Sequence, residues 1–462
     1  MRLTWAQPED LVAAELAALR EQGAAPDALA AIERRWVQHG GDPVLPPSGA
    51  SAEPAPPRLR ALARELLDEL ATLQPDSVAE PDDWTAIEAL LPAAPRLTQP
   101  AAADRDRVRG AWYGRAAGCL LGKPVEKIPR PGIEQIARAT GNWPISGYFT
   151  ARGLPAEIAR RWPWNRRSAP TSLVENIDGM PEDDDLNFAL LALELLEQHG
   201  AELTTDDVAL AWLANLPAGR VFTAERAAYR NLLDARPAPE TATHHNPFRE
   251  WIGALIRADA YGWAHPGDVR TAARQAWVDA RLSHTRNGLY GACWAAALCS
   301  AALVADDLDA VLDAAAAVVP PDSRLAAAVS DGREVGHSLA EGRIDAAAAL
   351  DALHERFGQL HWVHTLNNAA LIACALQSGV RLAPAERFGH GIALAVAGGW
   401  DTDSAGATVG SVLGALGGSG AIAPIWTDPL RGSIATSLPG GAERSIEELV
   451  DRTHALPRRT PA

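Results

Sequence analysis

The sequence predicts an all-α protein, and three observations support this class. Alanine is abundant, β-branched runs are scarce, and apolar residues recur at helical spacing along most of the 462 residues. No segment shows a convincing alternation of polar and apolar residues, which a half-buried strand would require. We therefore expect helices throughout, with the chemistry placed where loops meet helices.

The first hundred residues differ from the rest and predict short helices on flexible connections. Helical patterns at about 8–21, 26–38, 57–74 and 82–92 are separated by Pro-rich breaks at 45–49 and 53–57. We expect residues 1–100 to form an N-terminal helical extension and residues 101–462 to form the main all-α domain. A docking appendage without chemistry is the simplest interpretation of the extension.

Two ladders of glycines at four-residue spacing mark the two ends of the main domain. Either the two helices pack backbone to backbone, or each ladder only accommodates bulky neighbours; we favour direct contact. Their members are Gly110, Gly114, Gly118 and Gly122 in the first ladder, and Gly406, Gly410, Gly414 and Gly418 in the second.

Between the ladders, residues 140–182 are rich in Trp, Pro, Gly and Arg and predict a long irregular loop over the site. The remaining patterns predict helices at about 186–199, 205–215, 222–234, 247–259, 267–281, 287–304, 307–318, 322–338, 344–356, 362–378 and 384–398.

Charge and composition exclude several classes of function. The chain carries 42 basic and 58 acidic residues, a formal net charge of −16, so it lacks the basic surface of a nucleic-acid or anionic-membrane binder. The N-terminus has no apolar secretory region, and we expect a cytoplasmic protein. The uncharged stretch 404–425 is rich in glycine and predicts an interior helix instead of a membrane span. The four cysteines lie in helical stretches without a CxxC motif, so we expect buried free thiols.

Two acidic motifs stand at the heads of predicted helices. The run Asp183-Asp184-Asp185 precedes an apolar helix, and one Asp would suffice to cap it. Three like charges in a row need a compensating cation. In the second motif, the i, i+2 spacing would place Asp401 and Asp403 on the same side of an extended segment, with Ser404 beside them. Hard oxygen ligands of this kind suit Mg²⁺, and the two motifs together are sufficient for two ions.

These segments, in this order, resemble the ADP-ribosylglycohydrolase family. The matching pieces are RVRGAWYGRAAGCLLGKPVE, PEDDDLNFALLALELL, IGALIRADAYG, RLSHTRNGLYG and AVAGGWDTDSAGATVGSVLGALGG. The resemblance implies a compact orthogonal bundle of many helices, with two Mg²⁺ ions at its centre, that hydrolyses the glycosidic bond at C1″ of ADP-ribose.

Position by position, the resemblance also implies roles for individual residues. The metal ligands would be Asp183, Asp184, Asp185, Asp401, Asp403 and Ser404. Glu126 or Asp184 would activate the attacking water, and a substrate loop would contain His284, Gly288, Tyr290 and Gly291. Gly253 and Arg257 match weakly a segment near the ligand.

The chain departs from the family pattern at two places. Asp183 stands where Ser or Thr is usual, and Trp400 is inserted before the second acidic motif. The extra carboxylate would tighten cation binding, and the tryptophan would reshape the pocket.

Three functions remain open on this basis. The first is Mg²⁺-dependent hydrolysis of an ADP-ribosyl bond on a protein or small molecule, with Mn²⁺ as a possible replacement ion. The second is hydrolysis of a small N-riboside derived from a nucleotide, and the third is binding of ADP-ribose without catalysis. We expect a monomer with no nucleic-acid or membrane partner.

Overall fold

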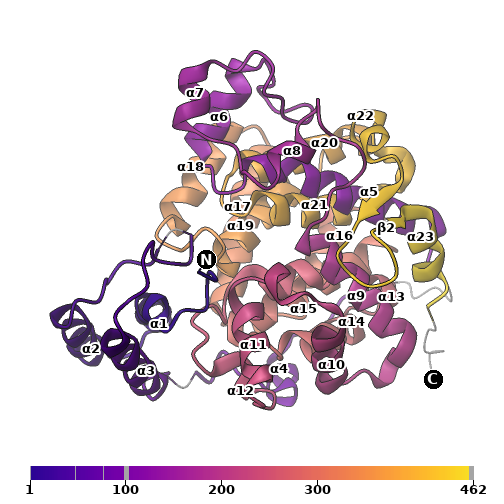
Figure 1. Ribbon diagram of the computed structural model, residues 1–462. Helices are drawn as coiled ribbons and strands as arrows, with labels where there is room; N and C mark the ends of the chain where they lie inside the picture. Colours follow the sequence, from indigo (N-terminus) through magenta and orange to yellow (C-terminus); the bar gives the residue numbers. More distant parts are fainter. Residues whose placement is uncertain (1, 47, 76, 98–102, 457–462) are drawn as a thin grey trace.

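The computed structural model describes residues 2–46, 48–75, 77–97 and 103–456, and it confirms the all-α class. The N-terminal helices of the chain, drawn in indigo and violet in Figure 1, are mostly gathered at one side of the molecule. They are α1 (Pro8–Glu21), α2 (Pro26–Gln38), α3 (Pro57–Ala71) and α4 (Trp84–Leu90). Proline occupies the first turn of α1, α2 and α3, where its missing N–H costs nothing. Only α4 lies apart, where Trp84 packs against Trp277 with ring centroids 6.1 Å apart.

The rest of the chain is a bundle of helices with one short hairpin. Its α-helices are α5 (Arg105–Gly122), α6 (Arg130–Ala139), α7 (Ala156–Arg161), α8 (Ala169–Ser172), α9 (Asp184–His199), α10 (Thr205–Asn215), α11 (Thr223–Leu233), α12 (Glu240–Thr243), α13 (Asp259–Ala264), α14 (Val269–Ala280), α15 (Arg286–Ala302), α16 (Leu308–Ala316), α17 (Arg324–Ala340), α18 (Ala346–Phe357), α19 (Thr365–Ser378), α20 (Pro384–Ala397), α21 (Thr402–Gly417), α22 (Pro424–Thr427) and α23 (Ile446–His454). The hairpin pairs β1 (Ser433–Ala435) with β2 (Glu443–Ser445) in antiparallel register, Ser433 opposite Ser445.

Helices α5 and α21 pack backbone to backbone, as the glycine ladders predict. A Cβ on Gly110 would lie 2.0 Å from the carbonyl oxygen of Gly414, and one on Gly114 would lie 2.0 Å from that of Gly410. The same close approach recurs from Gly118 to Gly406. Because residue numbers rise along one helix as they fall along the other, the two helices run antiparallel. Any side chain in this interface would force them apart.

The interior of the bundle is built from helices that are buried on every side. Almost every residue of α15, α19 and α21 is buried, so the glycine-rich stretch that begins at residue 404 starts as an interior helix, as predicted. Within the described ranges, no helix is both long and apolar enough to cross a membrane. The four cysteines are buried free thiols, which confirms the sequence prediction.

The structure differs from the expected helices in several places, and it also contains α6 and α23, for which no helix was expected. Residues 247–259 form a 3₁₀ segment, η4 (Ile252–Arg257), instead of one α-helix. Tertiary pairing explains this, because Trp251 bridges to His364 and the Ile252 N–H donates to the Val363 carbonyl. The loop 140–182 contains the short helices α7 and α8, and the hairpin β1–β2 was not anticipated because three-residue strands carry too little alternation.

Candidate active site

A cavity of about 950 Å³ opens where several distant segments of the chain meet. Its walls include the start of α9, the start of α21, η4 and the loop 162–168, which covers the site as predicted. Glu126, Asp183, Asp184, Asp401, Asp403 and Ser404 all line it. The two acidic motifs, about two hundred positions apart in the sequence, therefore face one space.

The glycine contact between α5 and α21 brings Glu126 and the second acidic motif to the same end of the helix pair. Thr402, which separates the two aspartates of the second motif, donates its hydroxyl to the carbonyl of Gly122 at 2.9 Å. Gly122 is the last residue of α5, and the 3₁₀ turn η1 (Lys123–Val125) leads from it to Glu126. On the other side, the Asp401 N–H donates to the Asn368 side-chain oxygen at 3.2 Å. The second motif is thus fixed to α5 and to α19.

Two of the acidic side chains have a basic side chain beside them, but only Asp183 is neutralised by it; burial still raises the pKa of Asp185 well above its usual value. The Nζ of Lys123 donates to a carboxylate oxygen of Asp183, whose other oxygen accepts the Asp185 N–H at 2.9 Å and caps α9. Asp185 does not line the cavity among the described residues, and Arg115 Nη2 lies 3.5 Å from its carboxylate. Burial alone would raise the pKa of Asp183, but the Lys123 ammonium and the hydrogen bonds lower it below its usual value.

The other carboxylates of the motifs have no such partner. In the described part of the chain, no Lys or Arg lies within ion-pair distance of Asp184, Asp401 or Asp403. Burial and the neighbouring carboxylates raise the pKa of Asp184 and Asp401 well above the usual value and that of Asp403 to about 7. Uncompensated oxygen ligands gathered in one cavity fit a divalent cation, because such a cation removes the repulsion that raises their pKa.

The Lys123–Asp183 pair predicts a large effect on stability. Replacing Lys123 with methionine leaves a buried, unpaired carboxylate, and we expect the free energy of unfolding to fall by ~3–5 kcal/mol. Adding Asp183→Thr to that variant removes the charge and is expected to restore most of the loss. Urea unfolding of the two single variants and the double variant measures the coupling. Simple additivity of the two single effects would show that the pair does not interact.

Glu126 lines the cavity at the exit from α5 and is held from two sides. The side-chain amide of Asn165 donates to one of its oxygens, and Lys127 Nζ lies 3.3 Å from the other. Asn165 belongs to the Trp-rich loop, so the loop that covers the cavity also orients this carboxylate.

The four residues of the expected substrate loop lie elsewhere. His284, Gly288, Tyr290 and Gly291 are buried, and none is among the described residues that line the cavity. Tyr290 donates its hydroxyl to the Pro81 carbonyl at 2.5 Å, and a Cβ on Gly288 would lie 2.4 Å from the Arg249 carbonyl oxygen. The structure gives these residues packing partners, and their contact with substrate stays a prediction. Of the weaker pair, Gly253 lines the cavity and Arg257 is buried in an ion pair with Glu225.

Trp400 is buried and is not among the described residues that line the cavity. Its indole stacks on His354 of α18, with ring centroids 4.3 Å apart and an angle of 22° between the rings. Its φ of 61° turns the chain sharply before Asp401. The insertion therefore anchors the second motif on α18 without contributing to the pocket wall.

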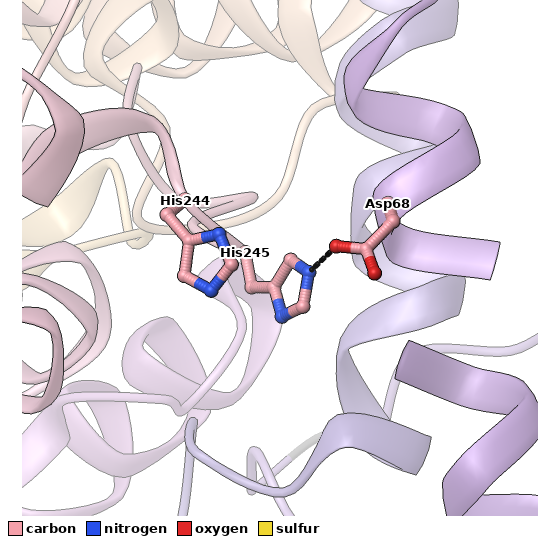
Figure 2. A group of neighbouring side chains, drawn as sticks. All are labelled: Asp68, His244 and His245. Carbon is pink, nitrogen blue, oxygen red and sulfur yellow. Dashed lines mark hydrogen bonds and ion pairs between the residues drawn. The ribbon is translucent and has the colours of Figure 1, made fainter. Parts of the chain in front are cut away.

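A separate group of possible ligands joins the extension to the main domain. His245 lies 2.7 Å from Asp68 of α3, and His244 is beside it (Figure 2). The two imidazoles stack with centroids 3.9 Å apart and 22° between their planes. Lone pairs of ring nitrogens lie in the ring plane, so those of the two stacked rings lie in separate, nearly parallel planes and do not converge on one ion. The group is better explained as a contact that holds α3.

Sequence reasoning missed several residues that shape the cavity. Lys123 and Asn165 act on acidic residues far from them in the sequence, and Glu225 reaches the cavity from α11. Thr4, Trp5 and Ser48 line it from the N-terminal extension. The one available signal was the position of Lys123, three residues before Glu126 in a segment that resembles the family. The other contacts depend on folding.

Fold and cavity together define the class: an all-α protein with an acidic small-molecule site suited to divalent cations. The sequence profile of the ADP-ribosylglycohydrolases matches residues 100–461, and the chain belongs to this family. It is accordingly a hydrolase, a glycosidase that acts on ADP-ribosyl groups.

Comparison with solved structures and curated proteins adds little beyond this. A structure described as an ADP-ribosylglycohydrolase-related protein complex is 23% identical, over 76% of this chain and 97% of its own, with a TM-score of 0.43. Similarity at that level carries no argument about activity. No curated protein matches the chain.

Proposed function

We propose that this glycosidase is Mg²⁺-dependent and cleaves the bond at C1″ of an ADP-ribosyl group, with Asp184, Asp401, Asp403 and Ser404 as ligands. The observation that supports the proposal is the cavity itself, in which these side chains converge without a cation of the protein to neutralise them. Asp183 and Asp185, each next to a basic side chain, would complete the outer part of a two-ion site. Mn²⁺, which takes similar oxygen ligands, would replace Mg²⁺.

Bound Mg²⁺ would supply Lewis-acid charge that fixes the ribose hydroxyls and a water molecule. Residues of the chain would transfer the proton and stabilise the transition state. Glu126, which accepts a hydrogen bond from Asn165, would accept a proton from the attacking water as it approaches C1″. Asp184 is the alternative base. The carboxylates that line the cavity would stabilise the positive charge that develops on the sugar in an oxocarbenium-like transition state.

Basic side chains on the cavity wall complement the diphosphate of an ADP-ribosyl group. Lys127, Arg166 and Arg167 line the cavity together with the acidic residues. A diphosphate carries negative charge that these side chains would bind, while the carboxylates and their cations hold the ribose. The cavity thus offers opposite charges to the two halves of an ADP-ribosyl group.

Removal of divalent cations tests the proposal directly. We expect EDTA to abolish the release of ADP-ribose from ADP-ribosylated substrates, and addition of Mg²⁺ or Mn²⁺ in excess to restore it. Ca²⁺, which prefers longer bonds and more ligands, serves as the comparison ion. Undiminished turnover in chelator, after exhaustive dialysis, would rule out a metal-dependent mechanism.

A further inference from the structure

The N-terminal extension reaches the proposed active site. Thr4, Trp5 and Ser48 line the same cavity as Asp184 and Asp403. The matched family region begins only at residue 100, so these three residues lie outside it. Part of the cavity wall is therefore supplied by a segment that does not belong to the family's common core.

This wall is built into the structure. The Trp5 indole packs edge-on against Phe248, Trp251 and His361, with centroids 5.4, 5.6 and 6.0 Å away. Two of these neighbours adjoin residues that line the cavity themselves, Ile252 and Trp362. The main-chain carbonyl and the hydroxyl of Thr4 both accept from Arg226 Nη1, each at 2.8 Å.

The turn that carries Ser48 is fixed to Trp5. The Trp5 N–H donates to the Gly49 carbonyl at 2.5 Å. Gly49 has a φ of +70°, and a Cβ there would lie 2.2 Å from the Trp5 ring. Ser51, two residues further, donates its N–H to Asp10 of α1 at 3.1 Å. Residues 4–5 and 48–51 thus form one unit that is held by α1 and by the main domain.

We propose that this unit, defined as residues 4–5 and 48–51, determines substrate size, so that the enzyme prefers a small ADP-ribosyl compound to ADP-ribose attached to a folded protein. The proposal rests on the proposed function. The cavity is bounded by the Trp-rich loop, which supplies Trp162 and Trp164, and by this unit. Its volume of about 950 Å³ is at the upper end of the range for small-molecule sites. To cleave ADP-ribose from a protein, the cavity would have to accommodate the attached protein between the Trp-rich loop and this unit.

The test compares one glycosidic linkage on two carriers. ADP-ribosylarginine as the free amino acid and the same linkage on a folded protein differ only in bulk, and serine-linked pairs extend the comparison. We expect kcat/KM to be at least about tenfold higher for the free compounds, a difference of about 1.4 kcal/mol. Trp5→Ala opens the wall and is expected to reduce this preference, whereas Trp36→Ala, in the same extension but outside the cavity, is expected to leave it unchanged.

A second variant tests the same proposal without removing a buried tryptophan. Ser48 is exposed, so Ser48→Trp adds bulk to the cavity without disturbing the core. We expect it to weaken binding of free ADP-ribose, measured calorimetrically in Mg²⁺, by about tenfold. Val44→Trp, at a residue that is 66% exposed and outside the cavity wall, is the matched control.

The outcomes separate the two proposals. Equal kcat/KM for free and protein-linked substrates, or unchanged ADP-ribose affinity in Ser48→Trp, would overturn the role of the extension and leave the hydrolase assignment intact. Failure of every ADP-ribosyl compound to bind or be cleaved in the presence of Mg²⁺ would instead overturn the proposed function and, with it, this inference.

Discussion

Asp403→Asn is expected to lower kcat for hydrolysis of an ADP-ribosyl bond by a factor on the order of 10³. Asparagine has nearly the same shape but no charge, so the change removes the negative charge of a proposed cation ligand and little else. Asp403 lies in the first turn of α21, and its carboxylate accepts the Ser404 N–H at 3.1 Å, a contact that the asparagine oxygen can keep. The loss should therefore come from chemistry and not from folding.

The effect of Mg²⁺ on the melting temperature is a second measurement for this variant. Mg²⁺ should raise the melting temperature of the wild-type protein, because a ligand that binds only the folded state stabilises it. In Asp403→Asn the Mg²⁺-dependent rise should largely disappear, while melting without metal should be equal or higher, since a repelling charge is gone. Asp322→Asn, at an exposed position outside the cavity, is the control. Full activity with an unchanged Mg²⁺ response would remove Asp403 from the site.

Gly114→Ala is expected to destabilise the fold by about 3 kcal/mol or more. Its Cβ would lie 2.0 Å from the Gly410 carbonyl oxygen, an atom of the opposing backbone that cannot rotate aside. Helices α5 and α21 would have to separate, and the loss is large beside a total stability of about 5–15 kcal/mol.

Urea unfolding measures this effect, with Gly420→Ala as the matched control. Gly420 has open space around its Cβ position and lies just beyond the end of α21. Its substitution should change the free energy of unfolding by less than about 0.5 kcal/mol. Equal midpoints for the two variants would mean that α5 and α21 tolerate a wider separation than the close backbone contact indicates.

Local sequence patterns predicted those parts of the molecule that depend on spacing within one segment. The four-residue repeat of glycines predicted direct helix contact, and the aspartates at helix starts predicted an acidic cavity. The extension helices α1 and α2 begin and end where the apolar periodicity and the prolines place them. In these cases the signal belongs to a short stretch of chain, even where, as with the glycines, the contact joins two distant helices.

The remaining features depend on contacts between segments that are distant in sequence. Residues 247–259 are apolar enough for an α-helix, yet pairing with residues 363–364 holds part of them in a 3₁₀ segment. The pairing of Asp183 with Lys123 spans sixty positions, and the arrival of Trp5 at the cavity spans several hundred. No sequence periodicity predicts such a contact, because the sequence around each partner is ordinary.

The glycine contact between α5 and α21 also limits which substitutions the protein can accept during evolution. Glu126 follows the end of one helix and the Asp401–Ser404 motif begins the other, so both travel with a single rigid unit that rejects even a methyl group. Substitutions are therefore poorly tolerated in the helix pair that carries these cavity residues. The Trp-rich loop and the N-terminal segment lie outside this helix pair, so changes in them can alter the cavity wall while the positions of Glu126 and the second acidic motif are kept.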